Sequence, residues 1–184
     1  MRILAVSGSL RGDSYNTSLL RAAAEVAPEG VELELWEGLG ELPVYDQDLE
    51  DGETPASVRR LREAWSAADA ILFATPEYNG SIPGGLKNAI DWASRPKLRA
   101  ALTNKTVAVV GASTGQFGAL WAQQDLKKVL GVAGARVVGT EILVGRAHER
   151  FDAGGRLLDA ELREQLRLHL ETLAEAAAPL ERAA

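Results

Sequence analysis

Short apolar runs of strand length alternate along the chain with longer stretches that have the spacing of amphipathic helices. The runs are rich in Ile, Leu, Val and Ala, and most are followed by small and polar residues. They cover residues 3–6, 31–36, 70–74, 106–110 and 136–144, the last broken by Gly139. Strands that alternate with helices form parallel sheets covered on both faces. The pattern therefore predicts an α/β fold with a five-stranded parallel sheet.

Five stretches have helical spacing. The first begins near Asn16 and stops at Pro28-Glu29-Gly30, and the third opens at Pro83-Gly84, because proline is favourable in a first helical turn. The fourth ends near Leu130. In two of the five stretches the apolar residues fall on one face of the helix. In the second stretch along the chain they are Val58, Leu61, Trp65 and Ala68. In the fifth and C-terminal stretch they are Leu158, Leu162, Leu166, Leu170 and Leu173.

Residues 31–55 differ from the rest of the pattern. The run 31–36 alternates apolar residues with Glu32 and Glu34, which predicts a strand with one wet face near the edge of the sheet. Residues 37–55 form the longest irregular stretch, and such loops are often functional or mobile. We interpret its acidic group, Asp46–Asp51, as a solvated surface.

Composition narrows the protein class. The 184 residues are 46% hydrophobic and 25% charged, which is typical of a globular protein, and the length predicts one domain over residues 1–184. The net charge of −6 argues against nucleic-acid binding, and the absence of cysteine excludes disulfides, thiol nucleophiles and thiolate metal sites. Ser7 interrupts the first apolar run before it reaches the length of a signal-peptide core. No apolar run is long enough to span a membrane. We expect a cytoplasmic protein.

The loop after the first apolar run offers many hydrogen-bond donors. It carries one guanidinium, four hydroxyls and one amide, on Arg11, Ser7, Ser9, Ser14, Thr17 and Asn16. A helix start adds free N–H groups, and this combination suits a phosphate dianion. The loop matches neither GxGxxG nor GxxxxGK[ST], so neither a dinucleotide fingerprint nor an ATP loop is predicted. A plain helix cap is the alternative.

Two further loops follow the third and fourth apolar runs. Residues 75–85 are rich in proline and glycine, Tyr78 could stack on an aromatic ring, and Glu77 and Asn79 could contact the edge of that ring. Residues 111–118 are small and polar, which lets a flat ligand approach the main chain. Because ligands of open α/β sheets bind beyond the carboxyl ends of the strands, we expect all three loops to share one site.

Other chemistry has little support. His148 and His169 are the only histidines, and they lack metal-ligand spacing. No GxSxG elbow is present around a serine. We therefore expect no metal site and no catalytic side chain.

With these motifs, the chain resembles the NADPH-dependent FMN reductase family over nearly its whole length. The resemblance rests on three blocks, Gly8–Arg11 with Ser14–Asn16, Thr75–Asn79 with Pro83-Gly84 and Leu86–Trp92, and Gly111–Gly115 with Phe117-Gly118. It implies a flavodoxin-like three-layer sandwich with strand order 2-1-3-4-5.

The resemblance also implies an FMN site. By analogy, Ser9, Arg11, Ser14, Tyr15, Asn16 and Thr17 would surround the phosphate. The isoalloxazine ring and ribityl chain would lie against Pro76, Glu77, Tyr78, Asn79 and Gly80, with Ser113, Thr114 and Gly115 opposite. Family members form homodimers or homotetramers, and residues 84–94 are our candidate for part of the interface.

Two positions depart from the family pattern. Gly80 stands where some relatives carry a bulky aromatic residue, which would leave the flavin face more open. Trp121 stands where many relatives have an arginine, so a polar contact between subunits at this position is in doubt. The tryptophan could instead pack at an interface or cover the substrate pocket.

The implied activity is that of an oxidoreductase with ping-pong kinetics. NADPH or NADH would reduce FMN and leave, and a quinone, an azo compound, chromate or free flavin would then take the electrons. The flavin carries this chemistry, so no protein acid, base or nucleophile is required. Two alternatives remain open, a flavodoxin-like electron carrier served by a partner protein and a flavin-free regulatory or structural domain.

Overall fold

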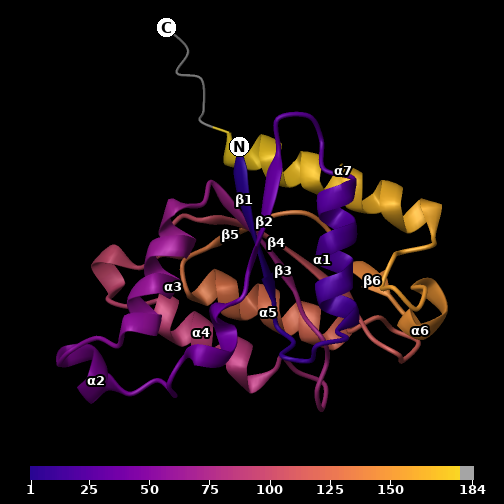
Figure 1. The fold of residues 1–184 in the computed structure, drawn as a ribbon. Helices are drawn as coiled ribbons and strands as arrows, with labels where there is room; N and C mark the ends of the chain where they lie inside the picture. The colour runs from indigo at the N-terminus through magenta and orange to yellow at the C-terminus, as the bar shows by residue number, and fades with distance from the viewer. Residues whose placement is uncertain (179–184) are drawn as a thin grey trace, which may run out of the picture.

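The computed structural model describes residues 1–178, which form a parallel sheet between two layers of helices (Figure 1). The strands are β1 (Arg2–Ser7), β2 (Glu32–Trp36), β3 (Ala70–Ala74), β4 (Thr106–Ala112), β5 (Arg136–Val137) and β6 (Ile142–Val144). Their order is β2-β1-β3-β4-β5, with β6 also paired to β4, and every pairing is parallel. The flavodoxin-like fold with order 2-1-3-4-5 is thereby confirmed.

Alternate residues of each central strand serve opposite layers. In β1, Leu4 and Val6 pack toward one set of helices, whereas Ile3 and Ala5 pack toward the other. The first layer contains α3 (Ala56–Ala67), α4 (Gly84–Ala93) and α5 (Leu120–Val132). The second contains α1 (Tyr15–Glu25), α6 (Ala147–Arg150) and α7 (Ala160–Ala177). Because both faces are covered, the central strands read as continuous apolar runs.

The helix starts follow ordinary capping chemistry. The Ser14 side chain accepts a hydrogen bond from the Thr17 N–H at the start of α1, and Pro83 precedes α4 as predicted. At α7, the Asp159 side chain caps the N–H groups of Glu161 and Leu162. The predicted C-terminal helix therefore begins after Leu158, whose side chain is exposed rather than part of the apolar face.

Residues 37–55 are more ordered than the sequence predicts. They contain a 3₁₀ helix, η1 (Gly38–Glu41), and a short helix, α2 (Gln47–Asp51). Two side chains of α4 hold the connecting main chain. The Asn88 Oδ1 accepts from the Tyr45 N–H at 2.7 Å, and the Trp92 Nε1 donates to the Pro43 carbonyl at 2.9 Å. A second 3₁₀ turn, η2 (Lys97–Arg99), follows α4.

The predicted fifth strand is split at Gly139, as its sequence suggests. β5 pairs with the first two residues of β4, and β6 pairs with the last three, so residues 138–141 leave the ladder. Gly139 has a φ of +76°, and a Cβ there would lie 2.6 Å from His169 Cε1. Glycine is therefore required at the break for conformation and for space.

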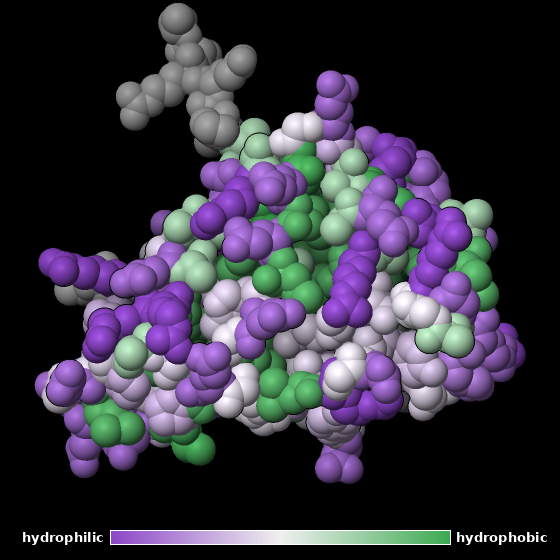
Figure 2. Space-filling model, viewed as in Figure 1, coloured by the Kyte–Doolittle hydropathy of each residue, from purple (hydrophilic) through white to green (hydrophobic). Residues whose placement is uncertain are grey.

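The opposite edge of the sheet is β2, as predicted from its alternating pattern. Glu32 and Glu34 are exposed, while Leu33 and Leu35, which alternate with them, are half-buried. Figure 2 shows apolar surface in the middle of this face, where β2 lies in Figure 1, with hydrophilic residues around it. Separately, no helix within residues 1–178 has both the length and the apolar character needed to cross a lipid bilayer.

Candidate functional site

The three loops that follow β1, β3 and β4 meet at one edge of the sheet. Between them lies a pocket of about 130 Å³. Its lining contains only residues expected from the sequence, apart from Ala112. The lining residues are Ser9, Arg11, Ser14, Tyr15, Asn16, Pro76, Glu77, Tyr78, Ala112, Ser113 and Thr114. Ala112 belongs to the predicted third loop but not to the individually named contacts, and it is the last residue of β4, which runs two residues beyond the predicted end of its apolar run.

The first loop is held close to β3. The Gly8 N–H donates to the Ala74 carbonyl at 2.7 Å. A Cβ at Gly8 would lie 2.9 Å from Leu86 Cδ2, so a larger residue would force the buried Leu86 side chain to shift. Gly8 thereby fixes where residues 9–14 emerge from the sheet.

Arg11 and the start of α1 supply unused donors at the pocket. Arg11 is exposed, and its Nη2 makes one long contact, 3.3 Å, with the Asp13 carbonyl. Within residues 1–178, the main-chain N–H groups of Gly12, Tyr15 and Asn16 have no acceptor. A fixed positive charge beside free N–H groups at a helix start is the donor set that a phosphate dianion requires.

Asn16 and Thr17 use their side chains within the protein. The Asn16 Nδ2 donates to the Ala112 carbonyl, and its Oδ1 accepts from the Ala112 N–H, both at 2.9 Å. Thr17 Oγ1 donates to Ser7 Oγ at 2.9 Å and does not line the pocket. The side chains of Asn16 and Thr17 therefore hold the loop in position. For Asn16 this differs from the prediction that its side-chain amide would donate to a bound phosphate.

The second loop ends in a tight turn. Tyr78 and Ser81 exchange two main-chain hydrogen bonds, at 3.0 and 3.2 Å, around Asn79 and Gly80. Both central residues have positive φ, 54° and 74°, which is the type I′ geometry that Asn-Gly favours. Tyr78 lines the pocket and is half exposed, whereas Asn79 and Gly80 form the tip and do not line it.

Two polar contacts tie the second loop to α5. The Glu77 Oε2 accepts from the Ala122 N–H at 3.2 Å, and the Ser81 hydroxyl donates to Asp125 Oδ2 at 2.5 Å. Next to these contacts, Phe117 and Trp121 form an edge-to-face pair with ring centres 5.2 Å apart. Each of the two rings is about half exposed. The start of α5 therefore presents an aromatic pair beside the site.

The third loop is held from the side of β6. The Ser113 N–H donates to the Val144 carbonyl at 3.0 Å, and the Gly115 carbonyl accepts from the Arg146 N–H at 2.9 Å. Ser113 and Thr114 line the pocket, whereas Gly115 does not. Gly111, at the base of the loop, is in close contact with Gln123, whose Nε2 would lie 2.7 Å from a Cβ there.

The pocket continues into a shallow hollow of about 350 Å³. Arg11 and Tyr78 belong to both, and the hollow is completed by Gly8, Leu10, Pro83, Gly84 and Gly85. A larger groove of about 690 Å³ lies between α4 and α5, and none of the predicted site residues lines it. The site edge thus combines a polar pocket suited to phosphate with an open apolar surface suited to a flat ring.

Neither histidine belongs to this pocket. His148 is exposed on α6. His169 is 6% exposed on α7, and burial, together with the nearby Lys127 ammonium, lowers its pKa from 6.5 to about 4. Across residues 1–178, no three His, Cys, Asp or Glu side chains gather in a way that could hold a metal ion.

Comparison with known families identifies what kind of protein has this arrangement. Residues 1–149 match the model of the NADPH-dependent FMN reductase family. The chain belongs to this family. An NAD(P)H-dependent FMN reductase of Pseudomonas aeruginosa is 43% identical over 174 residues, which cover 94% of this chain and 93% of the relative. A 2-hydroxy-1,4-benzoquinone reductase of a Burkholderia species is 35% identical, covering 95% and 94%.

A solved structure agrees with both fold and family. FerB of Paracoccus denitrificans, a flavoenzyme NAD(P)H:(acceptor) oxidoreductase, superimposes with a TM-score of 0.85 and 35% identity, covering 95% of this chain and 98% of FerB. This member of the FMN reductase family is therefore an oxidoreductase that uses FMN and NAD(P)H. The resemblance seen in the sequence is confirmed.

Proposed function

We propose that FMN binds where the three loops converge and that this convergence is the basis of the activity. The proposed contacts are Ser9, Arg11, Ser14, Tyr15, Asn16, Thr17, Pro76, Glu77, Tyr78, Asn79, Gly80, Ser113, Thr114 and Gly115. The observation that carries the proposal is the pocket between the three loops, with the exposed Arg11 in its lining. One FMN-binding domain would then extend over residues 1–184.

The phosphate end of FMN is assigned to the first loop. Arg11 supplies the charge, the Ser9 and Ser14 hydroxyls lie at the same pocket, and the Tyr15 and Asn16 N–H groups point from the start of α1. Asn16 and Thr17 act through their side chains only by holding Ala112 and Ser7 in place. These groups bind and orient the phosphate, and no proton moves on them.

The ring end of FMN is assigned to the second loop and the adjoining hollow. Pro76 is buried beneath the loop, and Tyr78 offers an aromatic face beside it. The bound FMN would accept hydride from NAD(P)H and pass electrons on, so the protein needs only to bind, orient and leave the ring accessible. We accordingly propose no catalytic side chain.

The proposed acceptor is a small molecule of the quinone class. Two relatives support it by name, the benzoquinone reductase of Burkholderia and a quinone reductase of Pseudomonas putida that is 40% identical over 85% of this chain. The tip of the second loop leaves space for such a ring, because a Cβ added at Gly80 would meet no other atom within 4 Å. Azo compounds, chromate and free flavin remain acceptors to be tested alongside.

We further propose a homodimer or homotetramer that works in the cytoplasm, where NAD(P)H is plentiful. Two features support assembly. The exposed Phe117 and Trp121 rings lie beside the site, and the groove next to α4 includes Val132, which is 85% exposed. Apolar side chains grouped at a surface mark sites where protein partners bind.

The visible spectrum of the purified protein tests the proposal. We expect flavin absorbance after incubation with FMN, and we expect it to bleach when NADPH or NADH is added without air. Flavin absorbance that neither nucleotide bleaches would favour the electron-carrier alternative. A protein that takes up no FMN at all would contradict the site assignment.

A further inference from the structure

A second polar pocket lies next to the proposed FMN site, on the far side of the third loop. Its volume is about 400 Å³, and its lining consists of Gln116, Leu143, Gly145, Arg146 and Arg150. None of these residues belongs to the proposed FMN contacts. Two guanidinium groups at one opening suit an anion, because arginine holds phosphate with several N–H donors at once.

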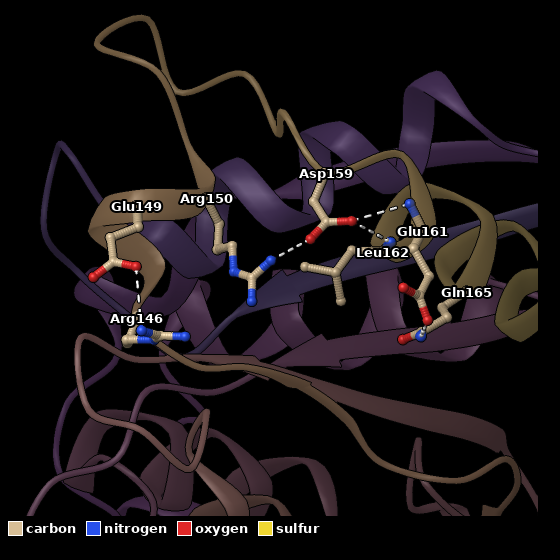
Figure 3. A network of polar contacts seen from close by, with 7 residues as sticks. All are labelled: Arg146, Glu149, Arg150, Asp159, Glu161, Leu162 and Gln165. Carbon is tan, nitrogen blue, oxygen red and sulfur yellow. Dashed lines mark hydrogen bonds and ion pairs between the residues drawn. The ribbon is translucent and has the colours of Figure 1, made fainter.

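The two arginines are placed together by α6. Arg146 precedes this single helical turn and Arg150 ends it, and both side chains line the same pocket. Figure 3 shows Arg150 extending toward Asp159 at the start of α7, with Arg146 at the other end of the turn. Both therefore reach the same pocket from one short element.

Neither arginine is fully used by its carboxylate partner. Arg146 lies 3.6 Å from Glu149, with both side chains at least half exposed, which makes a weak ion pair. Arg150 pairs with Asp159 through Nη1, while Asp159 is also occupied in capping α7. A guanidinium has five N–H donors, so each arginine retains donors for a further anion.

The main chain at Arg146 suggests that this side chain is needed. Its φ is +48°, a left-handed conformation that glycine or asparagine would adopt at lower cost. The strain is maintained by two hydrogen bonds to the third loop, from the Arg146 N–H to the Gly115 carbonyl and from the Ala147 N–H to the Ser113 carbonyl. An arginine in this place is accounted for if its guanidinium binds a ligand.

The two pockets are close enough to serve one molecule. Thr114 lines the proposed FMN pocket, and Gln116 lines the arginine pocket. Two residues of chain span at most about 7 Å. Phe151, directly after Arg150, also packs against Tyr15 of the FMN pocket with ring centres 5.6 Å apart. A dinucleotide is long enough to reach from one pocket to the other.

We propose that Arg146 and Arg150 bind the 2′-phosphate of NADPH and so make this enzyme prefer NADPH to NADH. The proposal rests on the function proposed above, because it requires the nicotinamide to lie at the FMN site. The two nucleotides differ only in this phosphate, a dianion that would fit between the two guanidinium groups. In NADH the ribose 2′ position carries a hydroxyl, so the pocket would meet no negative charge at that position.

The test compares Arg146→Gln and Arg150→Gln with Arg156→Gln, which removes an exposed arginine from the loop just after α6. For each FMN-loaded protein, the rate of anaerobic flavin bleaching is followed against NADPH and against NADH, which gives one dissociation constant for each nucleotide. We expect the NADPH constant to rise about tenfold in Arg146→Gln and in Arg150→Gln. The NADH constant should stay within twofold, and Arg156→Gln should match the wild type.

Three results would overturn the proposal. The first is a wild type that binds both nucleotides equally, and the second is an Arg146→Gln variant that weakens both to the same extent. In the third, FMN affinity falls instead, which would assign the pocket to the phosphate of the cofactor. Failure of the proposed function has a different signature, because then neither nucleotide bleaches the flavin of the wild type. Arg146→Gln keeps the test valid should Arg150→Gln unfold through loss of the Asp159 pair.

Discussion

The side chain of Asn16 forms both hydrogen bonds that the main chain of Ala112 can offer, at 2.9 Å each, across 96 positions of sequence. The pair joins the first turn of α1 to the end of β4. It thereby fixes the distance between the first and third loops, which form two walls of the proposed FMN pocket.

Replacing Asn16 with alanine should therefore loosen the pocket as well as the fold. The variant leaves the buried Ala112 N–H and carbonyl without partners, and we expect a loss of about 1–3 kcal/mol in the free energy of unfolding. FMN affinity should fall with it. Urea denaturation and FMN titration measure the two effects, with Gln124→Ala on the exposed side of α5 as the control. An unchanged unfolding midpoint would show that this contact is dispensable.

Arg11→Ala tests the phosphate end of the site. Arg11 has one long internal contact, so its removal should leave the fold intact and weaken FMN binding by about tenfold or more. The measurement is FMN fluorescence quenching on titration with protein. Arg21→Ala removes the same charge from an exposed position of α1 and should leave FMN binding unchanged. Full FMN retention in Arg11→Ala would refute the phosphate assignment.

Two glycine variants should shift stability in opposite directions. Gly80 has a φ of +74° with open space around it, so Gly80→Ala adds strain without a clash and should cost about 1 kcal/mol. Gly131 lies in the last turn of α5, also with open space, and Gly131→Ala should stabilise the protein by up to about 1 kcal/mol. Thermal unfolding of both variants checks the signs. A stabilised Gly80→Ala would contradict the left-handed conformation at the turn.

His169 should make the protein less stable in mild acid. Its pKa is about 4 in the folded chain against an ordinary value of 6.5, so the folded state favours the neutral ring. Desolvation is the main cause, Lys127 adds to it, and Glu141 opposes it. Stability is then complete above pH 6.5 and falls as the pH drops toward 4. The expected loss from this group by pH 5 is about 2 kcal/mol.

The His169→Gln variant isolates this contribution. Its free energy of unfolding in urea, compared between pH 7 and pH 5, should fall by less than that of the wild type. His148→Gln, which changes an exposed histidine, should behave like the wild type. If His169→Gln and the wild type show the same pH dependence, the ring is not held neutral by burial.

The parallel sheet and its two helical layers were predictable because the apolar runs and their spacing define buried strands with helices between them. The break at Gly139 was visible for the same reason. The strand order 2-1-3-4-5 came from the family resemblance, since the pattern of apolar runs does not fix which strands are neighbours. The ordered structure of residues 37–55 was not predictable, because it depends on Asn88 and Trp92. These two side chains come from a helix more than 40 positions away and form hydrogen bonds to the main chain of Tyr45 and Pro43. Pairing of that kind leaves no local pattern.

The site was predicted at the level of loops rather than of individual side chains. Arg11, Tyr78 and Ser113 line one pocket because their loops follow the neighbouring strands β1, β3 and β4. The place of each loop after its strand was therefore enough to predict that the loops meet. Residue type could not show that the Asn16 amide serves the protein itself, since a donor for a ligand and a donor for a distant carbonyl look alike in sequence. No signal in the sequence indicated the pair Arg146 and Arg150, proposed above to bind a phosphate, because the short turn between them has no helical periodicity.

The split between β5 and β6 also limits how copies of the chain can meet. An outer strand with a long row of unpaired main-chain groups invites another sheet to continue it. Here one border of the sheet is interrupted at residues 138–141, and the other carries Glu32 and Glu34. Both features disfavour strand addition at the borders of the sheet, and this favours assembly through the helices and loops.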